Sequence, residues 1–279
     1  MALIAVASAK GAPGVSTTAL ALAAVWPRRS LLVEADEHGG DLVFRQHGEG
    51  GQPLDPKIGM LSLALAGRRG LTAATVGEHT QTLHGGLDVL LGLASGEQAS
   101  AWTGLWPLLG RALATIGDTD VIADLGRIGP KSASLDLLSQ ASLVLLVSGT
   151  TPEELAAVRD RAAALGQRLG AAGVSGPPVA VLLVSSHREL AGARDGLISL
   201  LQAGRIGADV LGGITKDPKG ALQLAGRKGG RVERSELLRS ARLVVSNIGS
   251  RYGLGTGQAE QSPVRAARPA TMPAVQEVR

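Results

Sequence analysis

The stretch that decides the fold is Ser8-Ala9-Lys10-Gly11-Ala12-Pro13-Gly14-Val15-Ser16-Thr17-Thr18, which joins two segments of different character. Before it, residues 3–7 form a short apolar run with the length and composition of a central parallel strand. After it, residues 18–25 are rich in alanine and leucine and predict a helix. A strand, a glycine-containing turn and a helix in this order are the setting in which backbone N–H groups can bind phosphate.

The turn can be compared with the phosphate-binding motif G-x-x-x-x-G-K-[ST]. Ala9, Gly14, Val15 and Ser16 fall on its four defined positions. The second glycine and the hydroxyl that holds magnesium are therefore kept, whereas the lysine that reaches the β and γ phosphates is replaced by Val15. Taken alone, the loop is equally compatible with a plain turn rich in glycine and proline.

A lysine earlier in the turn, Lys10, changes this interpretation. With it, the loop resembles the deviant K-G-G-x-G-K-[ST]-T loop of the MinD/ParA family of P-loop ATPases. The chain matches that motif at Lys10, Gly11, Gly14, Ser16 and Thr17, and departs from it at Ala9, Ala12 and Val15.

The resemblance implies ATP and Mg²⁺ as cofactors and a homodimer as the functional form. In the family, the first lysine of the loop reaches the nucleotide of the partner subunit in a sandwich dimer, so Lys10 is expected to act in catalysis and in binding. The expected cofactor-binding residues of the turn are Lys10, Gly11, Gly14, Val15, Ser16 and Thr17.

Acidic residues end two further apolar runs. Glu34 and Asp36 follow residues 31–33, and because they alternate on a strand end they should point to the same side. By resemblance to the family's D-x-D segment, Asp36 matches the aspartate that orients the attacking water, and Glu34 replaces the other acid. The alternative is a solvated turn, since acidic residues and glycines are common after strands.

Asp124 ends the second of these runs, residues 121–124, and Gly126 follows it. An apolar strand ending in one aspartate has the form of a Walker B element, whose carboxylate holds the magnesium shell. Ser16 and Asp124 are therefore the expected magnesium-binding residues.

The expected base-binding region rests on resemblance alone. Residues 215–218 follow an apolar run and resemble the family's proline-and-acid turn beside the base, so Asp217 and Pro218 are expected to contact the nucleotide. Many members carry an asparagine after the preceding strand, where this chain has Ser185. His187 follows without a histidine or carboxylate at ligand spacing, which favours an ordinary loop histidine over a metal ligand.

Composition and pattern together predict one α/β domain. The 279 residues are 44% hydrophobic and contain no cysteine, which excludes disulfides, thiolate metal sites and cysteine nucleophiles. Apolar runs alternate with helical segments, which predicts a mostly parallel sheet of about seven strands with helices on both faces. We expect this P-loop domain to span residues 1–248 and a flexible tail to span 249–279. Residues 99–116 should form one helix, with Trp102 and Trp106 in the core.

The charge distribution is uneven. The segment Lys219–Arg242 carries seven basic and two acidic residues, a local charge of +5, whereas the whole chain carries +4. It could contact DNA non-specifically or bind an anionic membrane, or it could be a solvated helix face. No run approaches the roughly 20 apolar residues that span a bilayer, so we expect a cytoplasmic protein that is peripheral to a membrane at most.

Two hypotheses of function follow, and Val15 decides between them. Loss of the loop lysine favours a degenerate family member that acts as a dimeric scaffold or positioning factor for a cell-envelope machine such as a pilus or secretion system. The alternative is a weak but genuine ATP-switched ATPase in spatial positioning or DNA partitioning, in which Lys10 replaces the missing lysine.

Overall fold

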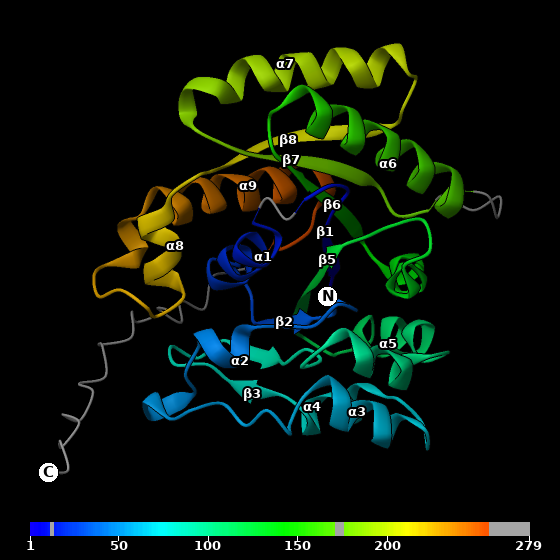
Figure 1. Ribbon diagram of the computed structural model, residues 1–279, viewed down its shortest axis with the longest axis vertical. Helices are drawn as coiled ribbons and strands as arrows, with labels where there is room; N and C mark the ends of the chain where they lie inside the picture. The colour runs from blue at the N-terminus through cyan, green and yellow to red at the C-terminus, as the bar shows by residue number, and fades with distance from the viewer. Residues whose placement is uncertain (12–13, 171–175, 257–279) are drawn as a thin grey trace, which may run out of the picture.

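The computed structural model describes residues 1–11, 14–170 and 176–256, which form an eight-stranded sheet with helices on both faces (Figure 1). The strand order is β3-β4-β2-β5-β1-β6-β7-β8. All neighbouring strands pair in parallel except β3 and β4. The strands are β1 (Leu3–Ser8), β2 (Ser30–Glu34), β3 (Gln81–Thr82), β4 (Asp88–Leu90), β5 (Asp120–Arg127), β6 (Leu143–Ser148), β7 (Val179–Ser185) and β8 (Ala208–Thr215).

The predicted sheet is confirmed, with one strand more than expected. The additional strand, β3, is only two residues long and consists of polar residues, so it shows no apolar alternation in the sequence. Its partner β4 contributes Val89 and Leu90 to the core. The missed strand therefore lies at an edge of the sheet and does not change the order of the central strands.

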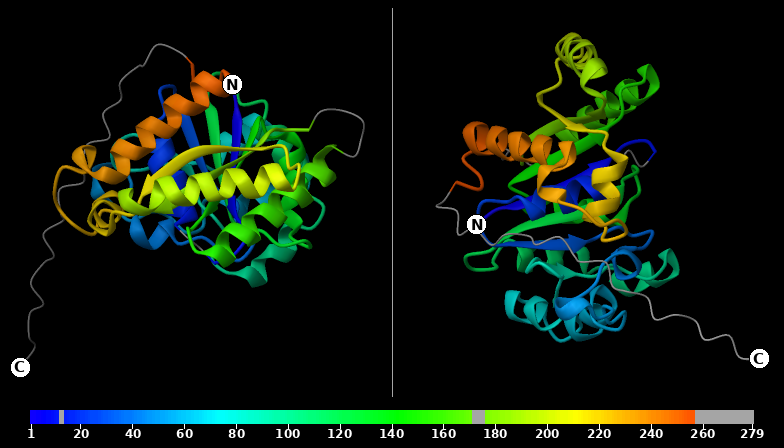
Figure 2. Two further views of the ribbon diagram at one scale, coloured as in Figure 1. Left: turned by 90° about the horizontal axis from the view of Figure 1, so that it is seen from above. Right: turned by 90° about the vertical axis from the view of Figure 1, so that its left-hand side faces the viewer.

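Each face of the sheet has its own apolar layer, as the alternation along β1 requires. Ile4 and Val6 pack with the helices α1 (Val15–Ala24), α8 (Pro218–Leu224) and α9 (Glu236–Tyr252), together with the short α2 (Leu42–Arg45). Leu3, Ala5 and Ala7 face the opposite layer. Figure 2 shows α9 and α6 on opposite sides of the sheet. The helices of the second layer are α3 (Met60–Gly67), α4 (Ala73–Glu78), α5 (Trp106–Leu113), α6 (Pro152–Gly170) and α7 (His187–Ala203).

The helix expected at residues 99–116 is wrong in its continuity. A 3₁₀ helix covers Gly96–Trp102, and α5 begins only at Trp106. Gly104 lies between them with φ of +74°, a conformation that other residues rarely adopt. Trp102 and Trp106 are nevertheless both buried, and their ring centroids are 5.3 Å apart, so their predicted place in the core is confirmed. The other 3₁₀ segments are Glu49–Gly51, Ala133–Gln140 and Val232–Arg234.

The last helix extends beyond the domain boundary expected at residue 248. It runs to Tyr252, whose hydroxyl donates a 2.6 Å hydrogen bond to Asp209 at the start of β8. Residues 249–252 therefore continue α9, and most of the segment expected to be a flexible tail, residues 257–279, lies outside the described part of the chain. Among the described helices, none is both long and apolar enough to cross a membrane.

A buried carboxylate ties the amino-terminal edge of the sheet together. Asp120 begins β5 and is fully buried. Its Oδ1 accepts the backbone N–H of Ala2 at 2.7 Å, and its Oδ2 accepts Nε1–H of Trp26 at 2.8 Å. The carboxylate thereby connects the start of β1, the start of β5 and the end of α1.

Asp120→Ala should destabilise the protein by about 2–4 kcal/mol, because it leaves the Trp26 and Ala2 donors buried without partners. The measurement is the free energy of unfolding from urea denaturation. Asp118→Ala is the matched control, since Asp118 lies two residues earlier and is exposed. A loss of under 1 kcal/mol for Asp120→Ala would show that the anchor contributes little.

Candidate functional site

The turn after β1 lies where the strand order reverses. β1 is flanked by β5 and β6, so the connections leave it in opposite directions and open a crevice at the carboxyl ends of the strands. Gly14, with φ of +85°, begins α1, and no described side chain caps that helix. The first N–H groups of α1 are therefore available to an anion.

The two predicted metal-binding residues, Ser16 and Asp124, lie together beside this helix start. The Ser16 hydroxyl lies near the Asp124 carboxylate, which accepts the Gly126 N–H at 2.9 Å. Burial raises the pKa of Asp124 to about 6, while the Ser16 hydroxyl and the Gly126 N–H act to lower it. One hydroxyl and one carboxylate suit Mg²⁺, which keeps waters and phosphate oxygens as its other ligands. The described residues contain no cluster of three or more histidine and acidic side chains that would form an all-protein metal site.

Asp36 lies at the same edge and faces the crevice. Its Oδ1 accepts the backbone N–H of His38 at 2.9 Å and lies 3.0 Å from the His38 ring Nδ1. A Cβ atom on Gly126 would overlap the Asp36 carboxylate, so the glycine allows β5 to approach it closely. Ser16, Asp36 and Asp124 are thus gathered in one place, as the strand ends predicted.

Glu34 does not face the crevice, although its alternation with Asp36 predicted that it would. Its side chain is buried, and its Oε1 accepts the N–H groups of Asp41 and Leu42, both at 3.0 Å. Its Oε2 accepts the N–H of Gly92 at 2.9 Å. Burial raises the pKa of Glu34 to about 7, against the effect of these three bonds. The residue therefore organises two loops beside the site.

Lys10 and Val15, which occupy the two lysine positions of the family motif, have different surroundings. Val15 is 3% exposed and packs in the apolar layer with α1 and α9. Lys10 is exposed and forms no ion pair with any described residue. The pKa of Glu153, at the start of α6, is lowered by its own N–H, by the Thr151 hydroxyl and to a smaller extent by Lys10. The Lys10 charge therefore acts on the start of α6.

Two hollows flank the start of α1, and Gly14 and Thr17 line both. The first is about 610 Å³ and lies over the ends of β6, β7 and β8. Thr18 also lines it, and its hydroxyl is buried without a hydrogen-bond partner among the described residues. The second is about 500 Å³ and lies over the ends of β2 and β5. Its other lining residues are Gly11, Val15, Ser16, Asp36, His38, Asp41, Arg45, Gly126 and Arg127.

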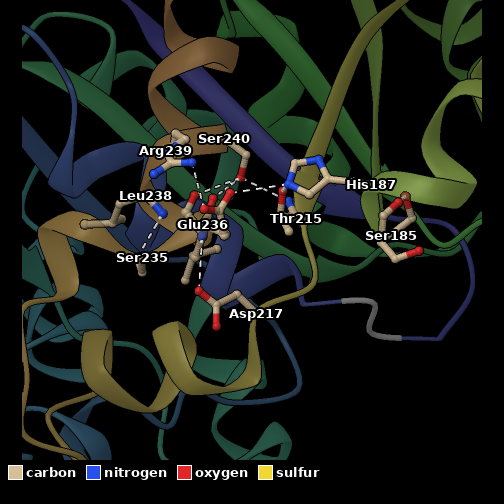
Figure 3. Close-up of polar contacts among 11 residues, drawn as sticks. Ser185, His187, Thr215, Asp217, Ser235, Glu236, Leu238, Arg239 and Ser240 are labelled. Atoms are coloured by element: carbon tan, nitrogen blue, oxygen red, sulfur yellow. Dashed lines mark hydrogen bonds and ion pairs between the residues drawn. The ribbon is translucent and has the colours of Figure 1, made fainter.

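The turn predicted to lie beside a base is held by α9 (Figure 3). The Thr215 N–H donates to Ser240 Oγ at 3.0 Å. Asp217 accepts the N–H of Gly220 at 2.8 Å and that of Leu237 at 3.4 Å, so its carboxylate caps α8 and also contacts the start of α9. Asp217 and Pro218 line the larger hollow, but the Asp217 side chain is already engaged.

His187 belongs to the same polar network, and it begins α7 (His187–Ala203) where an ordinary loop histidine was expected. Its Nε2 lies 3.3 Å from Glu236 Oε2 and 3.4 Å from Thr215 Oγ1, and Glu236 also pairs with Arg239 at 2.8 Å (Figure 3). These contacts connect the starts of α7 and α9 to the end of β8.

The basic segment Lys219–Arg242 covers α8 and the first half of α9. All seven of its lysine and arginine residues are exposed. Two of them are engaged: Arg239 pairs with Glu236, and Arg242 donates to the Glu233 carbonyl at 3.0 Å. The segment therefore presents a cationic surface beside the larger hollow, since Pro218 and Ala221 of α8 line that hollow.

The sheet order, the uncapped glycine turn and the Ser16–Asp124 contact define a class of protein: the chain has the α/β fold of MinD/ParA-type P-loop NTPases. Known structures with this fold cover most of the chain. A ParA family ATPase from Chlorobium tepidum superposes with a TM-score of 0.64 at 17% identity, over 88% of this chain and 98% of the other.

Two further solved structures agree with this assignment. MinD from Pyrococcus furiosus gives a TM-score of 0.62 at 18% identity, over 89% of this chain and 98% of the other. An ATP complex of McdA from Cyanothece gives a TM-score of 0.67 at 14% identity, over 94% of this chain and 99% of the other. No protein-family model matches the sequence, and no curated protein sequence matches it. The likeness therefore lies in the fold.

The sequence analysis missed Asp41 and Arg45, which line the smaller hollow. Their spacing of four residues is the available signal, because such a pair meets on one helical turn, and the structure shows this ion pair on α2. The spacing does not reveal that the pair faces the loop after β1, because that depends on how α2 packs.

Glu34 should make stability depend on pH. Its folded-state pKa of about 7 lies above the ordinary value of 4.5, so its contribution to stability is fully present below pH 4.5 and is lost as the pH rises through 7. Relative to Glu34→Gln, the wild type should lose on the order of 3 kcal/mol between pH 4.5 and pH 8. Urea denaturation across this range measures the difference. The control is Glu78→Gln, at an exposed position, whose free energy of unfolding should change with pH as that of the wild type does. If the free energy of unfolding of Glu34→Gln also changed with pH as that of the wild type does, the prediction would be contradicted.

Proposed function

We propose that the chain binds ATP with Mg²⁺ in the two hollows beside the start of α1 and uses the nucleotide to control a homodimer that acts as a positioning or partition factor. The observation that carries this proposal is the contact between Ser16 and Asp124 at the uncapped start of α1. The start of α1, which can bind an anion, therefore lies beside a hydroxyl and a carboxylate that can bind Mg²⁺.

The nucleotide would be divided between the two hollows. The phosphates would lie against the N–H groups that begin α1, with Ser16 and Asp124 holding the Mg²⁺. The base and ribose would occupy the larger hollow, where the free Thr18 hydroxyl and the backbone of residues 215–218 offer polar contacts. Mg²⁺ would supply charge neutralisation at the phosphates. Asp36, whose carboxylate faces the smaller hollow, would orient the attacking water.

The dimer would form through the face that carries the loop. Lys10 is exposed at this face and has no ion-pair partner among the described residues, so its charge is free to meet the phosphates of a second subunit. In a dimer, the Lys10 of each subunit would contact the triphosphate bound to the other subunit. Dimerisation would therefore depend on the nucleotide.

A second candidate function rests on Val15. Its side chain is packed in the apolar layer, so the fold does not need a nucleotide contact at this position. This favours a degenerate member that dimerises without ATP and serves as a scaffold for a cell-envelope, pilus or secretion machine. In that case Lys10→Ala should leave the dimer intact.

Calorimetric titration with Mg·ATP, combined with the measured mass in solution, separates the two candidates. For the ATP-controlled protein we expect binding in the micromolar range and a dimer that requires ATP. Ser16→Ala and Asp124→Asn should each weaken the binding by at least about tenfold, because each removes a magnesium-side donor. Ser250→Ala and Asp118→Asn are exposed controls. No binding at millimolar ATP, together with a dimer that persists, would favour the scaffold.

The basic segment adds an expected interaction with duplex DNA that does not depend on sequence. Arg227→Glu with Lys228→Glu should weaken binding to random duplex DNA, and the dependence of the affinity on salt should become shallower. The matched control is Arg68→Glu with Arg69→Glu, which makes the same charge change at two exposed residues after α3, on the other face of the sheet. Equal effects of the two pairs would show that only net charge matters.

A further inference from the structure

The phosphate side of the site lacks a lysine at position 15, yet it is not without cations. Two arginines, Arg45 and Arg127, line the smaller hollow together with Ser16 and Asp36. They differ in burial. Arg127 is exposed, whereas the Arg45 side chain is only 16% exposed.

Arg45 is held so that its guanidinium is partly free. One terminal nitrogen, Nη2, donates to the Asp41 carboxylate one helical turn earlier. Its Nε is buried and has no hydrogen-bond partner among the described residues. A buried guanidinium N–H without an acceptor is costly, so this group is arranged for an acceptor that the chain itself does not supply.

The charge of Arg45 already acts on the magnesium side of the site. Burial is the main reason that the pKa of Asp124 is raised, and Arg45 is among the groups that lower it. The shared hollow is the geometric ground for this effect, since Arg45 and Ser16 line it together.

Backbone contacts fix the position of α2, and with it Arg45. The Glu34 carboxylate accepts the N–H groups of Asp41 and Leu42 at the start of the helix. Just after the helix, Gln46 Nε2 donates to the Leu224 carbonyl at 3.0 Å. Both ends of this short helix are therefore attached to the rest of the fold, and Arg45 is presented from a defined position.

We propose that Arg45 supplies the phosphate-binding cation that Val15 cannot, and that its guanidinium recognises the terminal phosphates of the nucleotide. The inference rests on the proposed function and names the residue on which it depends. A guanidinium offers several N–H donors in one plane and can hold two phosphate oxygens at once. Lys10, whose charge acts on the start of α6, is left for contact with a second subunit.

The test is calorimetric titration with Mg·ATP and Mg·ADP. Arg45→Ala should weaken the binding of ATP by about 30- to 100-fold, as expected for loss of a charged hydrogen bond to phosphate, and should affect ADP less. Arg45→Lys should recover part of the loss because it restores the charge. The matched control is Arg168→Ala, which removes an arginine that also pairs with an aspartate, Asp136, but lies on α6.

A compensating variant makes the assignment specific. Adding Val15→Lys to Arg45→Ala should restore ATP binding toward the wild-type value, because the lysine returns to the position that the motif gives it. A second measurement needs no variant: Mg·ATP should slow the modification of Arg45 by phenylglyoxal, mapped by mass spectrometry, and leave that of Arg168 unchanged.

The outcomes separate the two levels of the proposal. If the wild type does not bind ATP and Arg45 is not protected, the proposed function fails and the assignment of Arg45 fails with it. If the wild type binds ATP and Arg45→Ala binds it equally well, the proposed function stands and only the assignment of Arg45 is overturned.

Discussion

The buried carboxylate of Glu34 is the interaction on which the position of α2 beside the smaller hollow depends. It accepts N–H groups from Asp41 and Leu42 on one loop and from Gly92 on another. Gly40 and Gly92 are required beside it, because a Cβ atom on either would contact the Glu34 side chain too closely. Burial opposes the charge and the three bonds favour it, and the raised pKa shows that burial prevails. The start of α2 is therefore attached to the end of a central strand.

This attachment determines the charge of the crevice. Asp36 follows β2 and Asp124 lies within the adjacent strand β5, while Arg45 comes from the helix that Glu34 holds. Acidic and basic groups thus meet around the start of α1. A metal ion suits the acids, while the helix N–H groups and the guanidinium suit an anion, so a magnesium-bound phosphate satisfies both sets together.

Much of the fold could be predicted from the sequence because parallel strands that are buried on both faces are continuous apolar runs. Residues 3–7, 31–33 and 121–124 are of this kind, and their carboxyl ends placed Ser16, Asp36 and Asp124 at one edge. The direction of Glu34 could not be predicted, because alternation on a strand ends where the strand ends and the next loop decides the rest. The interruption at Gly104 and the short β3 were missed because each depends on tertiary contacts.

At the proposed phosphate site, the loop after β1 separates what the backbone would contribute from what side chains would contribute. Its anion-binding groups are backbone N–H groups at the start of a helix, and these depend on the conformations of Gly11 and Gly14 and not on side chains. The lysine of the common motif adds only a positive charge, and a charge acts from any position that is close and poorly solvated. Arg45 meets both conditions from another segment of the chain. Under the proposal, a valine at position 15 removes a residue from the motif while Arg45 keeps a cation at the site.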